Sequence, residues 1–390
     1  MIRTMADLVH PGDPAELIAA AVEHRRLLMR TDRQTSFASL LPWSTIDKLI
    51  TTEALMGGLL RPARKGIDLP LNMVMALDRK RGGWMLKRDK LQALRHQGLS
   101  LVIDRIDEQV PEIGAMNALL ERHLRCPIWT NCYISFNRDS AFNVHWDDHN
   151  VLILQIHGRK RWMCYGQPYR FPVRSPAHPM PSVPGTAEWE VVLEPGDVLY
   201  VPRGEVHKAE VVGAESVHLT VGIAPPRGGD VLRWLAERAL SDETVRRDIN
   251  PLDRPEELSE RNRSLKATFH RFIDEIDIAT FLADQDRSRS PYRPDNIGSD
   301  FVLDPETLVR PALKRILPLP EGGRTDVEVR FGEVATRLNS VERAVLARLL
   351  EKDTVSVRHL IESFEGVAAE EITAGITSLS RKCLVFLSIG

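Results

Sequence analysis

Two histidines and one aspartate have the spacing expected of ligands to a single metal ion. His145 and Asp147 are two residues apart, so on a strand their side chains point to the same face. Farther along the chain, a turn at Pro202-Arg203-Gly204 is followed by His207. Two histidines and one carboxylate leave coordination positions open, which is typical of non-haem Fe(II) and O2 chemistry. We therefore predict that His145, Asp147 and His207 bind a metal ion.

Other histidines compete for this role. His149 shares the strand parity of His145, so the pattern leaves open whether it is a further ligand or a substrate contact. We interpret His157 and His218 as ordinary residues of the β-rich region. A lone His-x-Asp pair is common and predicts little by itself. The same pair followed by a Pro-x-Gly-x-x-His string is much more specific.

A lysine near the metal motif indicates an anion site. Lys160 shares its strand parity with Trp162 and Cys164. If that apolar pair faces the interior of a β-barrel, the lysine points into the interior as well. A buried lysine is costly unless it meets an anion. A dicarboxylate cosubstrate would supply one. The alternative is a lysine that extends to solvent at the barrel mouth; the metal motif leads us to favour the anion.

These residues lie in a β-rich region from residue 128 to residue 223. Short runs separated by turn residues predict strands at 131–136, 151–157, 161–165, 190–192, 198–201 and 217–223. Such a pattern favours an all-β barrel or sandwich. A helix is expected before it at 110–124, with Pro111 in the first turn.

The chain becomes helical again after Pro225-Pro226. Large apolar residues in this part are Leu232, Trp234, Leu235, Phe269, Phe272, Ile273 and Phe281. The composition of 286–299 is typical of a linker. Beyond it we expect helices at 340–350, 357–364 and 370–382 and a strand at 383–389, which together suit a winged helix.

Composition limits the function classes. A chain of 390 residues is too long for one ordinary core, so two or three domains are expected. A net charge of −2 gives no general support for nucleic-acid binding, although a local basic patch stays open. The sequence contains no apolar run of about 18 residues, so no membrane span is expected. Its acidic start is unlike a signal peptide. The four cysteines form no CxxC pair, so we expect reduced thiols in a cytoplasmic protein.

The segments 131–162 and 196–207 resemble the JmjC-type oxygenases, in particular the ribosomal-oxygenase (cupin-4) branch of ribosomal protein hydroxylases. The resemblance implies an α+β fold: a double-stranded β-helix (cupin/jelly-roll) barrel with flanking helices, a helical dimerisation region and a C-terminal winged-helix domain. The corresponding domains would be 1–228, 229–296 and 297–390. The family implies a homodimer.

The resemblance also implies cofactors and residue roles. His145, Asp147 and His207 would hold Fe(II), and Lys160 would bind the distal carboxylate of 2-oxoglutarate. The implied further cosubstrate contacts are Asn131, Tyr133 and Thr220. Gly222 departs from the family pattern, because a serine is often found there.

The expected function is therefore hydroxylation of a protein or peptide side chain, with a ribosomal-protein Arg or His as target and succinate and CO2 as products. Asp148 and His149 are candidate substrate contacts. One alternative is an oxygenase acting on a small metabolite or on a natural-product precursor peptide. Another is a metabolite-sensing, DNA-binding regulator without catalysis. The expected recognition helix at 370–382 has its basic residues, Arg381 and Lys382, at its far end, so nucleic-acid binding is not expected.

Overall fold

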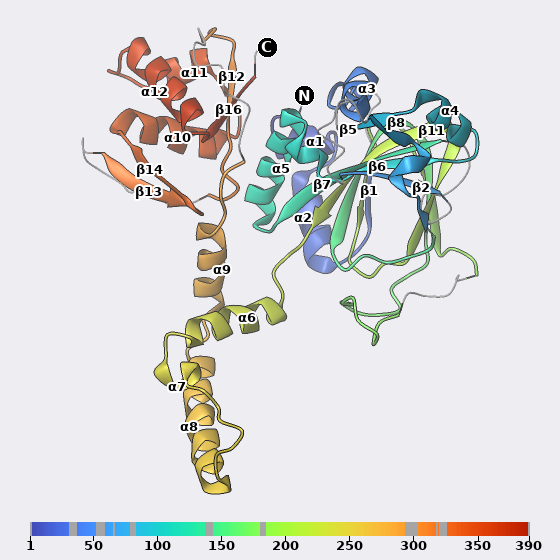
Figure 1. Ribbon diagram of the computed structural model, residues 1–390. Helices are drawn as coiled ribbons and strands as arrows, with labels where there is room; N and C mark the ends of the chain where they lie inside the picture. Colours follow the sequence, from blue (N-terminus) through green and yellow to red (C-terminus); the bar gives the residue numbers. More distant parts are fainter. Residues whose placement is uncertain are drawn as a thin grey trace.

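The computed structural model describes residues 2–30, 37–51, 59–64, 67–78, 83–136, 143–179, 185–292, 303–316, 319 and 326–388. In these parts the chain forms a large body built on a β-sheet, a projecting arm of helices, and a smaller body at the C-terminal end (Figure 1). Among the described residues, no helix is long and apolar enough to cross a membrane.

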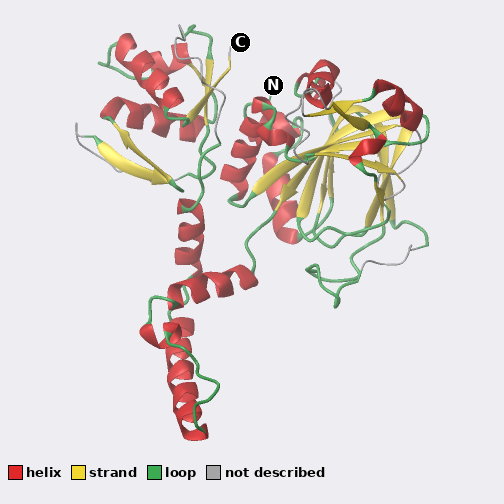
Figure 2. Ribbon diagram, in the orientation of Figure 1, coloured by secondary structure: helices red, strands yellow, loops and turns green. Residues whose placement is uncertain are grey.

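A nine-stranded antiparallel sheet forms the larger body, in the order β1-β10-β8-β11-β7-β6-β2-β3, with β9 paired to β8. Its strands curve around a common interior (Figure 2). They are β1 (Leu27–Met29), β2 (Leu60–Arg64), β3 (Ile67–Asp68), β6 (Ser100–Ile103), β7 (Ile128–Phe136), β8 (Asn150–Cys164), β9 (Trp189–Leu193), β10 (Val198–Val201) and β11 (His207–Ile223).

Two strands differ clearly from the sequence prediction. Strand β11 begins at His207, ten residues before the predicted run at 217–223. The runs predicted at 151–157 and 161–165 are a single strand, β8, which continues through Gly158. This glycine has φ +62° where the pairing with β11 shifts register, and a Cβ there would lie 2.1 Å from the Glu215 carbonyl oxygen. Gly158 thus marks an irregularity within one strand rather than a turn between two.

The helices that accompany the sheet come from the N-terminal third of the chain. They are α1 (Met5–Val9), α2 (Pro14–Glu23), α3 (Trp43–Thr51), α4 (Arg88–Arg95) and α5 (Pro111–Leu124), with 3-10 turns η1 (Phe37–Ser39), η3 (Leu71–Met73) and η4 (Ile106–Glu108) and a hairpin of β4 (Met75–Asp78) and β5 (Gly83–Leu86). Helix α5 confirms the prediction at 110–124, including Pro111 in its first turn.

The arm consists of α6 (Gly228–Ala239), α7 (Glu243–Arg246), α8 (Pro255–Asp274) and α9 (Ile278–Arg287). Trp234 joins α6 to α9: its indole N–H donates to Asp284 at 2.9 Å, and its ring packs edge-on against Phe281. Helix α8 points away from both bodies (Figure 1). Several of its large apolar side chains, with others of the arm, are exposed: Leu232, Leu258, Phe269, Ile273 and Ile278.

The smaller body has its own hydrophobic core. It contains a three-stranded sheet in the order β15-β12-β16, a hairpin and three helices: β12 (Leu308–Pro311), β13 (Val327–Phe331), β14 (Val334–Leu338), α10 (Ser340–Lys352), β15 (Val355–Ser356), α11 (Val357–Glu362), α12 (Ala369–Arg381) and β16 (Val385–Ser388). The predicted helices and terminal strand are therefore present. The predicted linker begins in the last turn of α9, and its residues 293–299 lie outside the described residues.

Helix α5 joins the two bodies. Glu121, fully buried, accepts from Arg289 at 2.7 Å and lies 3.0 Å from Arg315. Arg122, also buried, donates to the Leu313 carbonyl at 2.9 Å and pairs with Asp353 at 2.9 Å. A small apolar cluster of Ala115, Ala118, Tyr292, Ala312 and Phe386 completes the contact. The helix is thus part of both bodies.

Candidate metal centre

The three predicted ligands meet at one point. One ligand atom from each of His145, Asp147 and His207 lies within 4.8 Å of the others, and His207 Nε2 is 3.7 Å from Asp147 Oδ2. The Nδ1–H groups of His145 and His207 are placed to donate to the carbonyls of Asn143 and Glu205, at 2.7 and 2.9 Å. With Nδ1 held in this way, Nε2 is the nitrogen that each ring can offer to a cation. Burial, with His145 close by, lowers the pKa of His207 to about 4, which keeps its imidazole neutral.

Backbone pairing sets this geometry. His145 and His207 exchange two backbone hydrogen bonds, at 3.1 and 2.8 Å, so the two ligands lie side by side. The turn before His207 is closed by the Gly204 N–H, which donates to the Asp147 carbonyl at 3.0 Å. Gly204 has φ +85°, and a Cβ there would lie 2.6 Å from Pro172. The glycine of the Pro-x-Gly-x-x-His string is therefore required by both backbone and space.

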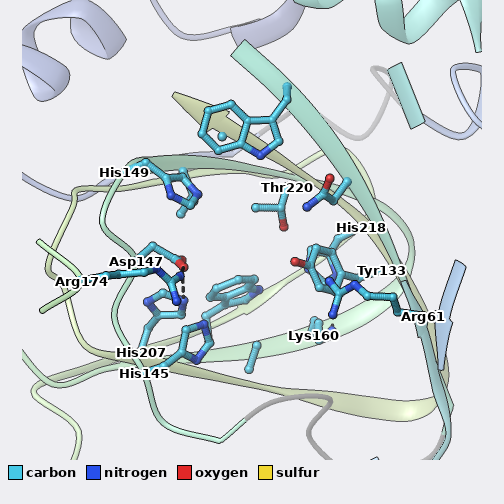
Figure 3. A pocket seen from close by; sticks show the side chains of 16 residues that line it. Arg61, Tyr133, His145, Asp147, His149, Lys160, Arg174, His207, His218 and Thr220 are labelled. Carbon is cyan, nitrogen blue, oxygen red and sulfur yellow. Dashed lines mark hydrogen bonds and ion pairs between the residues drawn. The ribbon is translucent and has the colours of Figure 1, made fainter. Parts of the chain in front are cut away.

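A cavity of about 420 Å³ opens beside the three ligands. In Figure 3 the ligands gather on one side, and Lys160, Tyr133 and His218 lie on the other. Their separation across one cavity leaves room for a small molecule between a metal ion and the lysine.

Lys160 lies inside the barrel, as its parity predicts. It is 2% exposed, and its neighbours Arg159 and Arg161 point outward. Burial lowers the pKa of Lys160 to about 7. Two other cations line the cavity: Arg61 on β2 is paired with Asp104 and Asp68, and Arg174 lies near Asp147 and Asp148. Among the described residues, Lys160 has no such carboxylate, so it is the cation available to a bound anion.

The other predicted cosubstrate contacts also line the cavity. Asn131 and Tyr133 are hydrogen-bonded to each other, and Asn131 Oδ1 accepts from the Arg105 N–H at 3.0 Å. Burial raises the pKa of Tyr133, so its hydroxyl stays protonated. Thr220 is paired with Asn131 in the register of β11 and β7. These residues offer neutral donors and acceptors to a molecule in the cavity.

An aromatic wall closes another side of the cavity. Trp129 packs against His149 with ring centroids 4.8 Å apart, and both line the cavity. The Trp129 indole occupies the space above Gly222, where a Cβ would lie 2.3 Å from the ring. The departure from serine at this position therefore makes room for Trp129. His149 lies outside the group of three ligand atoms, beside the metal centre.

Asp148 is at the rim rather than in the cavity lining. Its carboxylate is 3.3 Å from His149 and 3.5 Å from Arg174, and Arg227 donates to its carbonyl. Arg174 also comes within 3.9 Å of Asp147. Asp148 and His149, the predicted substrate contacts, thus lie beside the predicted metal ligand Asp147.

Sequence reasoning did not assign several residues of the cavity, among them Trp129, His218, Arg61 and Arg174. Trp129 has the strand parity of Asn131 and Tyr133, and His218 that of Thr220, so alternation could have found both. Arg61 had no local signal, because it comes from a distant strand. His157, interpreted as an ordinary barrel residue, packs on Trp43 and is hydrogen-bonded to the Leu41 carbonyl, away from the cavity.

Residues 108–231 match the family model of the JmjC domain. The chain contains a JmjC domain. This segment holds all three metal-centre residues and Lys160. In sequence the chain is also similar to an Aedes aegypti protein described as a bifunctional lysine-specific demethylase and histidyl-hydroxylase NO66, at 26% identity over 55% of this chain and 34% of the relative. Rat ribosomal oxygenase 2 is 34% identical over 28% of this chain and 24% of its own length.

Among solved structures, E. coli YcfD has the same overall fold. The match has a TM-score of 0.52 at 18% identity and covers 95% of this chain and 98% of YcfD. Another structure of that protein, described as a ribosomal oxygenase in complex with cobalt and succinic acid, gives 0.51 at 18% identity over 97% and 99%. These findings confirm the JmjC domain, the cupin-type fold and the relationship to ribosomal oxygenases. The chain spans about a third or less of the curated relatives named above.

Proposed function

We propose that this protein is an Fe(II)- and 2-oxoglutarate-dependent hydroxylase of a protein or peptide side chain. One observation carries the proposal: a His-Asp-His group and a buried lysine without a carboxylate partner, among the described residues, line the same cavity. The donor set suits Fe(II), and Lys160 suits one end of a dicarboxylate. When bound, iron and 2-oxoglutarate supply the oxidation of a C–H bond by O2, with succinate and CO2 as products.

The residues of this chain would bind the metal ion, orient the cosubstrate and exclude water from the site. His145 and His207, each held through Nδ1 by a backbone carbonyl, present Nε2 to the metal, and Asp147 adds the carboxylate. Lys160 would hold the distal carboxylate of the cosubstrate, with Asn131, Tyr133 and Thr220 along its length. The Trp129 indole covers one side of the cavity, which limits the access of water to the reacting centre.

The substrate would enter beside Asp148 and His149, on the open side of the metal centre. A ribosomal-protein Arg or His as target is supported by the names of the relatives, which include ribosomal oxygenases and a histidyl-hydroxylase. The partly buried carboxylate of Asp148, which lies near His149 and Arg174, can pair with a guanidinium or an imidazolium, and Trp129 offers a flat ring to either.

The test is to incubate purified protein with Fe(II), 2-oxoglutarate and a cell lysate, and then to map peptides that gain +16 Da by mass spectrometry. His145→Ala is the matched control, because it removes one predicted ligand at a partly exposed position outside the named strands. Modified peptides that depend on His145 and 2-oxoglutarate support the proposal. Consumption of 2-oxoglutarate with a small molecule as the only product would replace it with a metabolite oxygenase. Identical spectra for both proteins would refute it.

We further propose a homodimer formed through the arm. Its exposed apolar side chains, Phe269 and Ile273 among them, have no cover within the described chain, and self-association would bury them. Phe269→Glu with Ile273→Glu should shift the sedimentation mass toward the 44.0 kDa of one chain. Ile67→Glu, at an exposed apolar site on the sheet body, is the control. A wild-type mass of one chain would contradict the dimer.

The remaining assignments also stay proposals. The smaller body, with its helices and strands, would be a winged helix that contacts protein rather than nucleic acid, because its last helix begins with Glu370 and Glu371. The domain limits 1–228, 229–296 and 297–390 are kept as an interpretation. A cytoplasmic location accords with four free cysteines, of which Cys126, Cys132 and Cys164 are buried.

A further inference from the structure

The closed end of the cavity contains a second buried histidine. His218 on β11 is 3% exposed, and its Nδ1 lies 3.4 Å from Lys160 Nζ. Its ring is stacked on Tyr133 at 4.9 Å with an interplanar angle of 12°, and Trp162 meets it edge-on at 5.7 Å. Two aromatic rings from β7 and β8 therefore hold the imidazole in one orientation, facing the lysine.

The hydrogen-bonding capacities decide what His218 does. An ammonium group has three protons and no acceptor. Lys160 Nζ donates one proton to Ser135 Oγ at 3.2 Å, and His218 Nδ1 can accept another only as a neutral imidazole protonated at Nε2. Burial, together with the nearby Lys160, lowers the pKa of His218 well below its usual value, in agreement with a neutral ring. The third ammonium proton is then left for a ligand in the cavity.

We propose that His218 is a positioning residue of the anion subsite: with Ser135 it orients the Lys160 ammonium so that one N–H points at the distal carboxylate of the cosubstrate. The inference rests on the proposed function, since it assumes a dicarboxylate at Lys160. It assigns His218 a task that is separate from metal binding, because the metal ligands lie across the cavity (Figure 3).

A pH dependence follows from the groups that face His218 and Lys160. These are the lysine from β8, the Tyr133 phenol from β7 and the Trp162 indole, with Cys132 also near the lysine. In the free protein, burial lowers the pKa of Lys160 to about 7. A carboxylate binds the protonated amine, so its affinity should be highest below that pH and fall about tenfold per pH unit above it. Loss of the His218 acceptor disfavours the ammonium and should move this midpoint to lower pH.

The experiment measures binding of 2-oxoglutarate to the Co(II)-loaded full chain by calorimetry from pH 6 to pH 9. His218→Phe keeps an aromatic ring against Tyr133 but removes the acceptor. We expect about tenfold weaker binding at pH 7 and a midpoint lowered by about half a unit or more, with unchanged Co(II) affinity. His218→Asn restores an acceptor near the position of Nδ1 and should return both values most of the way to wild type.

His157→Phe is the matched control, since this barrel histidine lies away from the cavity and also packs on an aromatic ring. Wild-type affinity and midpoint in His218→Phe would overturn the inference, as would an equal loss in His157→Phe. Lys160→Met separates this failure from failure of the proposed function. If Lys160→Met loses 2-oxoglutarate binding and His218→Phe does not, only the role of His218 is wrong. If Lys160→Met binds as wild type does, the dicarboxylate site itself is wrong.

Discussion

Replacement of Lys160 by methionine should stabilise the ligand-free protein. The two side chains are similar in length, but methionine carries no charge into the barrel. An unfolded lysine keeps its proton up to a pH of about 10.4, whereas burial lowers the pKa of Lys160 to about 7. Because the two pKa values differ by about 3.5, burial of Lys160 lowers the free energy of unfolding of the wild type by about 5 kcal/mol at or below pH 7. The variant also loses the hydrogen bonds of Lys160 to Ser135 and His218, and each loss reduces the gain in stability by about 1 kcal/mol.

The expected net gain is therefore about 2–3 kcal/mol at pH 7, or an increase of about 2–4 °C in the melting temperature of the whole chain. The sign follows from proton binding: between pH 7 and pH 10 the unfolded chain binds more protons than the folded one, so wild-type stability rises with pH. The advantage of Lys160→Met should thus shrink as pH approaches 10. Calorimetric melting of metal-free protein at pH 7 and pH 9.5 measures both effects.

A surface lysine in the same barrel supplies the control. Lys208 on β11 is paired with Glu210 and is partly exposed, so Lys208→Met should change stability by less than about 1 kcal/mol. Added 2-oxoglutarate and metal should then stabilise wild type but not Lys160→Met. A Lys160→Met variant that melts at or below the wild-type temperature at pH 7 would refute the reasoning, because it would mean that the ammonium is solvated or already paired.

Three further outcomes follow from the site. Alanine at His145, Asp147 or His207 should abolish Co(II) binding in calorimetry while the far-UV circular dichroism stays that of wild type; retained Co(II) binding in any of them would exclude that residue as a ligand. Removal of metal with a chelator should leave the protein folded, and Co(II) at 100 times its Kd should add about 2.7 kcal/mol of stability, an effect that the ligand variants should lack. Gly222→Ser should lower stability by about 1–3 kcal/mol because its Cβ overlaps the Trp129 ring, and Trp129→Ala in the same chain should recover part of the loss; a stable single variant would show that the indole can move.

Strand alternation accounts for most of what could be predicted. The pair Asn131 and Tyr133 and the inward position of Lys160 follow from a period of two within one strand. His145 and Asp147 meet as predicted, but the strand premise was wrong for them: both precede β8, and His145 forms only an isolated bridge with His207. The same rule also predicts that Trp129 and His218 point into the barrel, although His218 was interpreted as an ordinary barrel residue. Its proposed role depends on the register of β11 against β7, which pairs it with Tyr133, and on the reach of the Lys160 side chain to its Nδ1. Neither can be read from one strand alone.

Features that depend on distant parts of the chain could not be predicted. Arg61 reaches the cavity because β2 joins the sheet through β6, and nothing near Arg61 indicates this neighbour. The continuity of β8 through Gly158 was missed for a related reason, since a glycine between two β-rich runs indicates a turn unless the partner strand is known. The exposed face of the arm was visible as apolar residues, but its partner is not encoded in any local pattern.

Helix α5 also limits how the chain can be truncated. A fragment that ends at residue 228 would keep every strand of the large sheet, yet Glu121 would lose both Arg289 and Arg315. Breaking a buried ion pair by removing one partner costs about 3–5 kcal/mol, a large share of the stability of a typical domain. Ala115 and Ala118 would lose their apolar cover as well. We therefore expect a fragment ending at residue 228 to be strongly destabilised, and a fragment that keeps the contacts of α5 to extend through β16.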